Sequence, residues 1–201
     1  METNPAVKIK KPKATNKPVQ PFTAEQVEAI LKATDSYPER NSYGHDNRAR
    51  MKAFVLTLRY TGLRIGDVVK LSRVQVSNGR VLLYTTKTGA PIYLPLPPVL
   101  LNALKVIENG SPYYFWTGKG SKGSLNTWSY AFKKLLKLAN VIGHAHMYRH
   151  TLAIELLEKG ITVEQVAAIL GNSPAIVYKH YAPWVKSRQD ALDGAIKQVW
   201  K

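Results

Sequence analysis

The chain has 201 residues, of which 45% are hydrophobic and 21% charged, so its composition is that of a folded domain and excludes disorder for the bulk. It has no cysteine, which excludes disulfides, thiolate metal sites and cysteine nucleophiles, and no apolar run long enough to span a membrane. Its 29 Lys and Arg residues against 13 Asp and Glu residues give a formal charge of +16, which points to nucleic acid first and to an anionic membrane surface or a ribosomal role second.

The first 20 residues differ from the rest of the chain. They hold five lysines and three prolines but almost no large apolar residue, so we expect them neither to build a core nor to act as a secretory signal. We expect residues 1–20 to be a flexible basic linker or arm, and residues 21–201 to form one domain. The candidate DNA-binding residues of the arm are Lys8, Lys10, Lys11, Lys13 and Lys17.

Helical patterns dominate the remainder. A capping-box pair at Thr23 and Gln26 starts the first helix, Ser124 is the predicted cap of a later one, and Gly160 and Gly171 separate helices near the C-terminus. The expected helices cover residues 23–34, 47–60, 66–71, 98–107, 124–140, 147–159, 162–170, 174–181 and 185–199.

The hydrophobic period changes in the middle of the chain. Residues 80–96 are rich in β-branched and aromatic residues and are divided by Thr88-Gly89, which predicts a hairpin with strands over 80–86 and 91–96. Tyr113–Trp116 is predicted to be a short buried strand or edge. The fold class is therefore mainly α with a small antiparallel β-sheet (α+β).

Three features are candidates for chemistry on the residues alone. His146 and Arg149 share a helical face, which suits an anion better than a metal, although a solvated helix start has the same pattern. Arg64 follows a helix and a glycine turn, or it is an ordinary surface arginine. Residues 162–181 have helix-turn-helix spacing that many helical hairpins share. Tyrosine is a conceivable nucleophile, but Tyr178 and Tyr181 are expected on one face, so spacing does not choose between them.

The segments TGLRIGDVVKL, TTKTG, HAHMYRHT and LGNSPAIVYKHYAPW, in this order, resemble the catalytic domain of the tyrosine recombinases, the phage-integrase family. The resemblance covers about residues 22–192. It implies the fold of that domain and a site-specific recombinase that cleaves and rejoins DNA through a covalent 3′-phosphotyrosine, without metal or cofactor. The rivals are a non-catalytic helix-turn-helix regulator and an enzyme like a type IB topoisomerase or telomere resolvase.

The same resemblance assigns the catalytic residues. The family's two arginines fall on Arg64 and Arg149, which suit the nonbridging oxygens of a phosphodiester because guanidinium groups bind them in bidentate pairs. His146 is the histidine of the His-x-x-Arg box and is expected to help deprotonate the nucleophile. Lys87 is the hairpin lysine and the candidate acid for the leaving 5′-hydroxyl.

The nucleophile position falls on Tyr181 rather than Tyr178, because it lies nine residues after position 172. The family usually carries a histidine or tryptophan at that position, whereas this chain has Asn172. An asparagine can donate a hydrogen bond to the phosphate but cannot exchange a proton. Asp67 matches an acidic position that is expected to support structure.

The resemblance also implies partners. We expect double-stranded DNA as the substrate, a monomer when free and a homo-tetramer on DNA, with no membrane association, at the nucleoid of a bacterial cytoplasm. The family's separate helical N-terminal DNA-clamp domain has no counterpart in this chain. The C-terminal helix, about residues 185–200, either docks on a neighbouring protomer or packs on its own chain.

Overall fold

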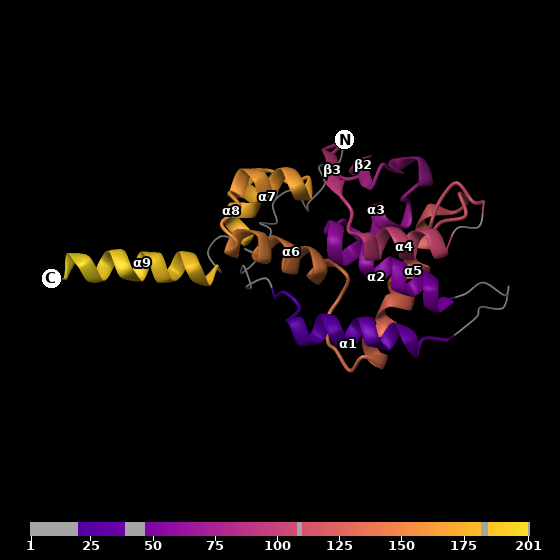
Figure 1. The fold of residues 1–201 in the computed structure, drawn as a ribbon, viewed down its shortest axis with the longest axis horizontal. Coiled ribbons are helices and arrows are strands. Elements are labelled where there is room, and N and C mark those ends of the chain that lie inside the picture. Colours follow the sequence, from indigo (N-terminus) through magenta and orange to yellow (C-terminus); the bar gives the residue numbers. More distant parts are fainter. Residues whose placement is uncertain (1–19, 39–46, 108–109, 182–184, 201) are drawn as a thin grey trace, which may run out of the picture.

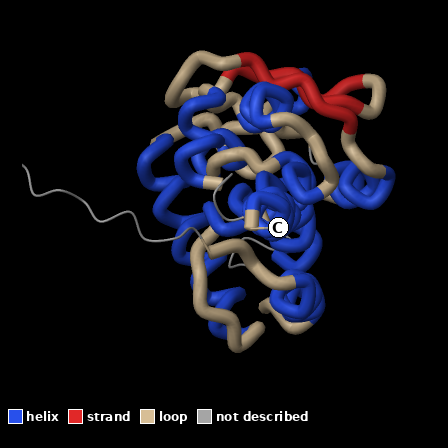
Figure 2. The backbone as a smooth tube through the Cα atoms, turned by 90° about the vertical axis from the view of Figure 1, so that its left-hand side faces the viewer, coloured by secondary structure: helices blue, strands red, loops and turns tan. Residues whose placement is uncertain are grey.

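The computed structural model describes residues 20–38, 47–107, 110–181 and 185–200. It is a helical body with one small sheet at its edge (Figures 1 and 2). The elements in chain order are α1 (Ala24–Asp35), α2 (Asn47–Thr61), α3 (Ile65–Val69), the 3-10 turn η2 (Arg73–Gln75), β1 (Val76–Ser77), β2 (Arg80–Tyr84), β3 (Pro91–Pro95), α4 (Pro98–Val106), α5 (Ser121–Leu138), α6 (His146–Glu158), α7 (Val163–Leu170), α8 (Pro174–His180) and α9 (Lys186–Val199).

Helix α2 lies at the centre of the larger core, where it packs against α1, α4 and α6. The apolar residues on its stripe are fully buried, and the ring of Phe54 stacks on Trp128 with centroids 4.3 Å apart while Phe115 meets it edge-on at 5.3 Å. Aromatic contacts of this kind add to the free energy gained by burial. The end of α2 is therefore a rigid point from which the chain continues into Arg64.

The sheet is antiparallel with strand order β1-β2-β3. Its register sets Leu83 opposite Ile92 on the buried face and Leu82 opposite Tyr93 on the exposed face, which is the alternation expected of a half-buried hairpin. The buried face contacts α7 through β3. The β2–β3 turn is thereby brought close to the C-terminal third of the chain.

Helices α6, α7 and α8 form a second, smaller core around Val166, Leu170 and Tyr181. Helix α9 differs from all of these, because it extends away from the body in Figure 1 and its residues 189–199 are all exposed. Every helix in the described ranges is too short or too polar to cross a lipid bilayer.

The observed elements confirm the mainly helical class, with three local differences. Helix α5 begins at Ser121 instead of Ser124, because Gly120 adopts a left-handed φ of 59° and accepts a bond from the Ser124 N–H within the first turn. Tyr113 forms a single bridge to Ser72 rather than a strand. A two-residue strand, β1, precedes the hairpin. The expected linker falls on residues 1–19, outside the described ranges, and on Gln20.

Candidate active site

The turn between α2 and α3 places Arg64. Gly62 has a φ of 59°, and a Cβ atom at this residue would lie 2.8 Å from Leu170 and 2.9 Å from Leu152, so only glycine lets α2 end against α6 and α7. Arg64 caps α3 and directs its Nη2 to Oδ1 of Asn172, 2.9 Å away. This hydrogen bond joins the turn between α2 and α3 to the end of α7.

Arg149 lies on α6 and is only 1% exposed. Its Nη1 donates to the carbonyl of Gly62 at 2.9 Å and its Nη2 to the carbonyl of Leu170 at 2.6 Å, so two helix ends fix the guanidinium plane. Burial, followed by the charge of Arg64, lowers the pKa of Arg149 to about 10, which leaves it charged at neutral pH. Within the described residues, its Nε and Nη1 of Arg64 are buried N–H donors without a partner.

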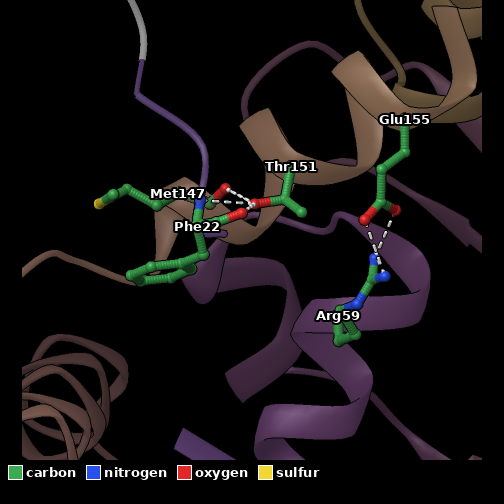
Figure 3. A network of polar contacts seen from close by, with 5 residues as sticks. All are labelled: Phe22, Arg59, Met147, Thr151 and Glu155. Carbon is green, nitrogen blue, oxygen red and sulfur yellow. Dashed lines mark hydrogen bonds and ion pairs between the residues drawn. The ribbon is translucent and has the colours of Figure 1, made fainter. Parts of the chain in front are cut away.

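Helix α6 is itself held at two points, shown in Figure 3. Arg59 of α2 makes a bidentate ion pair with Glu155, at 2.8 and 2.9 Å. Thr151 donates to the carbonyl of Met147 and accepts the backbone N–H of Phe22 at 2.8 Å. These contacts fix the position of α6, and so of Arg149, relative to α2 and to the first described residues.

Tyr181 comes directly after α8 and is 2% exposed. Its hydroxyl lies 3.0 Å from Nδ1 of His150 on α6. Burial raises the pKa of Tyr181, while the charges of Arg149 and Arg64 lower it. Tyr178 is 54% exposed, so the two tyrosines do not share an environment, contrary to their expected shared face. The helix ends at His180, which turns Tyr181 into the small core.

His146 begins α6 one turn before His150. Its side chain is exposed, and its ring lies edge-on to that of His150 with centroids 4.7 Å apart. The protein atoms around the ring, and then the neighbouring His150 and Arg149, lower the pKa of His146 to about 4. The histidine is therefore neutral at pH 7.

Asn172 follows α7, whose last turn is closed by Gly171 in the left-handed region. Because a guanidinium can only donate, Asn172 must present its amide oxygen to Arg64. The amide nitrogen Nδ2 does not take part in this contact and keeps its capacity to donate a hydrogen bond.

The β2–β3 turn carries Lys87 and is hydrogen-bonded on both sides. The backbone N–H of Thr86 donates to Oδ1 of the buried Asp67 at 2.9 Å, which agrees with a structural role for that carboxylate. The hydroxyl of Thr88 donates to the carbonyl of Gly171 at 3.3 Å. Lys87 is exposed between these two contacts, which hold its turn against Asp67 in the segment after Arg64 and against Gly171, the residue before Asn172.

Five of the six catalytic residues predicted from the sequence thus lie together in the structure, and His150, which was not predicted, lies with them. We call this set the tyrosine cluster: Arg64, His146, Arg149, His150, Asn172 and Tyr181. Lys87 lies in the turn beside it, and the five arm lysines lie outside the described residues. His150 was missed, although it is four residues after His146 and so on the same helical face. No group of three His, Asp or Glu side chains suited to a metal ion occurs among the described residues.

Residues 20–186 match the family model described as the phage integrase family. The chain belongs to this family. A tyrosine recombinase of Thermosipho africanus (strain TCF52B) is 27% identical over 189 residues, which cover 89% of this chain and 63% of that relative. The crystal structure of XerA recombinase matches with a TM-score of 0.66 and 20% identity, over 91% of this chain and 65% of that one. A lambda integrase tetramer bound to a Holliday junction matches with a TM-score of 0.60 and 20% identity, over 88% and 52%.

Membership of this phage integrase family confirms the resemblance found in the sequence, and the structural likenesses confirm the fold class. The interpretation as a tyrosine recombinase catalytic domain fits better than a helix-turn-helix regulator or a type IB topoisomerase. The chain spans 63% of the length of the curated relative described above.

Proposed function

We propose that this chain is the catalytic domain of a site-specific DNA recombinase that cuts and rejoins strands through a covalent 3′-phosphotyrosine at Tyr181. The observation that carries the proposal is the burial of the Tyr181 hydroxyl beside two arginines and a histidine. A tyrosine used only for packing gains nothing from two cations, which are costly to bury without an anion.

A DNA phosphodiester supplies the missing anion. The unpartnered N–H groups of Arg149 and Arg64 are suited to its nonbridging oxygens, and Nδ2 of Asn172 can donate as well. Negative charge grows on these oxygens as the phosphorus is attacked, so donors already fixed in place stabilise the transition state more than the ground state. Two guanidinium groups supply this charge themselves, and we therefore expect the reaction to proceed without a metal.

The covalent step exchanges one phosphate ester for another. Oη of Tyr181 forms a bond to phosphorus, the bond from phosphorus to the 5′-oxygen breaks, and Lys87 gives a proton to that oxygen. Because the phosphotyrosine conserves the bond energy, a 5′-hydroxyl can later attack it and restore the strand.

The substrate in this proposal is double-stranded DNA, at the nucleoid of a bacterial cell. A charge of +16 favours binding through release of counterions, so affinity should fall steeply with salt. The five lysines of residues 1–20 are expected to contact phosphates and add to that salt dependence.

Assembly on DNA is expected to use α9. Leu192, Ile196 and Val199 recur at helical spacing and are all at least 49% exposed, so this helix carries an apolar side that the described part of the chain leaves uncovered. We propose that it docks on a neighbouring copy in a homo-tetramer on DNA, as the tetrameric state of lambda integrase on a Holliday junction suggests. Removal of α9 should then abolish assembly of several copies on DNA while a single copy still binds.

The test of the chemistry is covalent capture. The chain is incubated in excess EDTA with a pool of nicked duplexes of randomised sequence, and protein–DNA adducts that resist detergent are collected. We expect adduct from the parent and from Tyr178→Phe but none from Tyr181→Phe, with a nucleotide on the peptide that contains Tyr181 by mass spectrometry. Adduct that persists in Tyr181→Phe, or that requires a divalent metal, contradicts the proposal.

A further inference from the structure

The hydroxyl of Tyr181 has a specific partner, and that partner is not the histidine expected to deprotonate it. The contact is to Nδ1 of His150, at 3.0 Å. The positive charge of Arg149 also acts on this hydroxyl and lowers the pKa of Tyr181. For the tyrosine to lose its proton along this contact, the hydroxyl must donate to Nδ1 of His150.

Proton transfer along this contact requires one particular tautomer of His150. To accept the tyrosine proton, Nδ1 must carry a lone pair, so the ring is neutral and its own proton is on Nε2. Burial, and then the electrostatic influence of His144, Arg149 and His180, lower the pKa of His150 to about 4, which keeps it neutral across the physiological range. The titratable and charged groups that face the ring come from α6, from α8 and its end, and from the segment before α6: His144, His146, Arg149, His180 and Tyr181.

We infer that His150 is the residue that takes the proton from Tyr181 when the tyrosine attacks the phosphodiester. This inference rests on the proposed function, in which Tyr181 is the nucleophile. The proton moves from Oη to Nδ1 as the bond from Oη to phosphorus forms and the bond to the 5′-oxygen breaks. When the strand is rejoined, the same proton returns from Nδ1 to the tyrosine oxygen, so His150 leaves each cycle neutral.

The bound phosphate makes His150 a better base than it is in the free protein. Among the causes that lower its pKa is the charge of Arg149, and a phosphodiester on that guanidinium offsets the charge. The pKa of His150 therefore rises toward its ordinary value when the substrate is in place. Proton acceptance is in this way coupled to the presence of the group that is to be attacked.

The test compares three substitutions in single-turnover adduct formation on the pool of nicked duplexes. His150→Gln keeps an oxygen that can accept the tyrosine hydrogen bond but cannot hold a proton at neutral pH, so it separates orientation from proton transfer. His150→Ala leaves a space that added imidazole can fill. His144→Gln is the matched control, since it removes an exposed histidine whose ring is 6.5 Å from that of His150.

We expect the parent and His144→Gln to react at rates that are level between about pH 7 and 9, because a histidine base is neutral there. His150→Gln should be slower by about a hundredfold or more at neutral pH, and its rate should rise about tenfold per pH unit, since the proton must leave to hydroxide. His150→Ala should regain rate with imidazole. A level profile in His150→Gln, or an absence of imidazole rescue, overturns the inference.

A second measurement does not depend on DNA. Nitrogen-detected NMR of the histidine side chains should show His150 with its proton on Nε2 at neutral pH and no titration above about pH 5. A proton on Nδ1 at neutral pH contradicts the inference even if the variants fail to fold. If the parent forms no adduct at Tyr181, the proposed function fails and the inference with it, whereas adduct with an unaffected His150→Gln overturns the inference alone.

Discussion

The two sides of the tyrosine cluster are held in different ways. On the α6–α8 side, Arg149 and Tyr181 are at most 2% exposed, and the guanidinium is fixed by two backbone carbonyls. On the hairpin side, Lys87 is exposed in a turn whose hydrogen bonds to α3 and to the end of α7 are made by its neighbours Thr86 and Thr88. The difference shows that the side chains proposed to bind and attack the phosphate, Arg149 and Tyr181, are already fixed in the free protein. The side chain proposed to protonate the leaving oxygen, Lys87, remains free to rotate.

The buried side should be the more sensitive to substitution. Arg149→Lys keeps a cation but replaces the planar guanidinium, whose separate nitrogens bind the two carbonyls, with a single nitrogen, so we expect covalent adduct formation to fall by about a thousandfold or more. The measurement is single-turnover adduct formation, with circular dichroism to establish that the variant is folded. A folded Arg149→Lys variant within tenfold of the parent would show that the fixed geometry of the guanidinium does not matter.

The exposed side should fail in a different manner. Lys87→Ala should slow adduct formation by ~10²–10⁴ because a positioned proton donor is lost. A substrate with sulfur in place of the 5′-oxygen has a leaving group that needs no proton, so the variant should recover most of its rate on it. Equal defects on both substrates would remove Lys87 from the role of acid.

Asn172 lies between the two sides and tests whether this departure from the family pattern is functional. Asn172→Ala should lose ~10²–10³ in rate, the usual effect of removing one donor to a developing oxyanion. Asn172→His should remain within about tenfold of the parent, a difference of ~1.4 kcal/mol. Asn172→Asp should be worse than alanine, because its carboxylate pairs with Arg64 and repels the phosphate. Parent-like activity in Asn172→Ala would place the residue outside the phosphate site.

The smallest effect is expected at the contact between the hairpin turn and α7. Thr88→Val removes a hydroxyl that donates to the Gly171 carbonyl, so the rate should fall about fivefold, as for the loss of ~1 kcal/mol. Thr86→Val is the matched control, since Thr86 is exposed and contributes its backbone N–H to Asp67. If both variants behave alike, the Thr88 hydroxyl does not position the turn.

Local signals in the sequence predicted most of the fold. The capping box of Thr23 and Gln26 is present with both of its hydrogen bonds, and the hairpin strands differ from expectation by one or two residues. The start of α5 was misplaced because a glycine in the left-handed region begins it, a geometry with no side-chain pattern. Tyr113–Trp116 looked like a strand because its residues are aromatic, but their rings pack into the core and around Trp116 instead.

The candidate site was predictable in part. Helical spacing alone put His146 and Arg149 on one face. The contact of Arg64 with Asn172 joins residues 108 positions apart, and that of His150 with Tyr181 spans 31 positions. Such pairings depend on how helices pack, and no periodicity within a segment encodes them, so the family resemblance was needed to bring Arg64, Asn172 and Tyr181 into one hypothesis.

The hydrogen bond from the backbone of Phe22 to Thr151 has a mechanical consequence. It brings the first described residues to α6, two positions along that helix from Arg149, across 129 residues of sequence. A pull on the segment before Phe22 therefore acts directly on α6, the helix that carries Arg149, as well as on α1, which begins two residues later at Ala24.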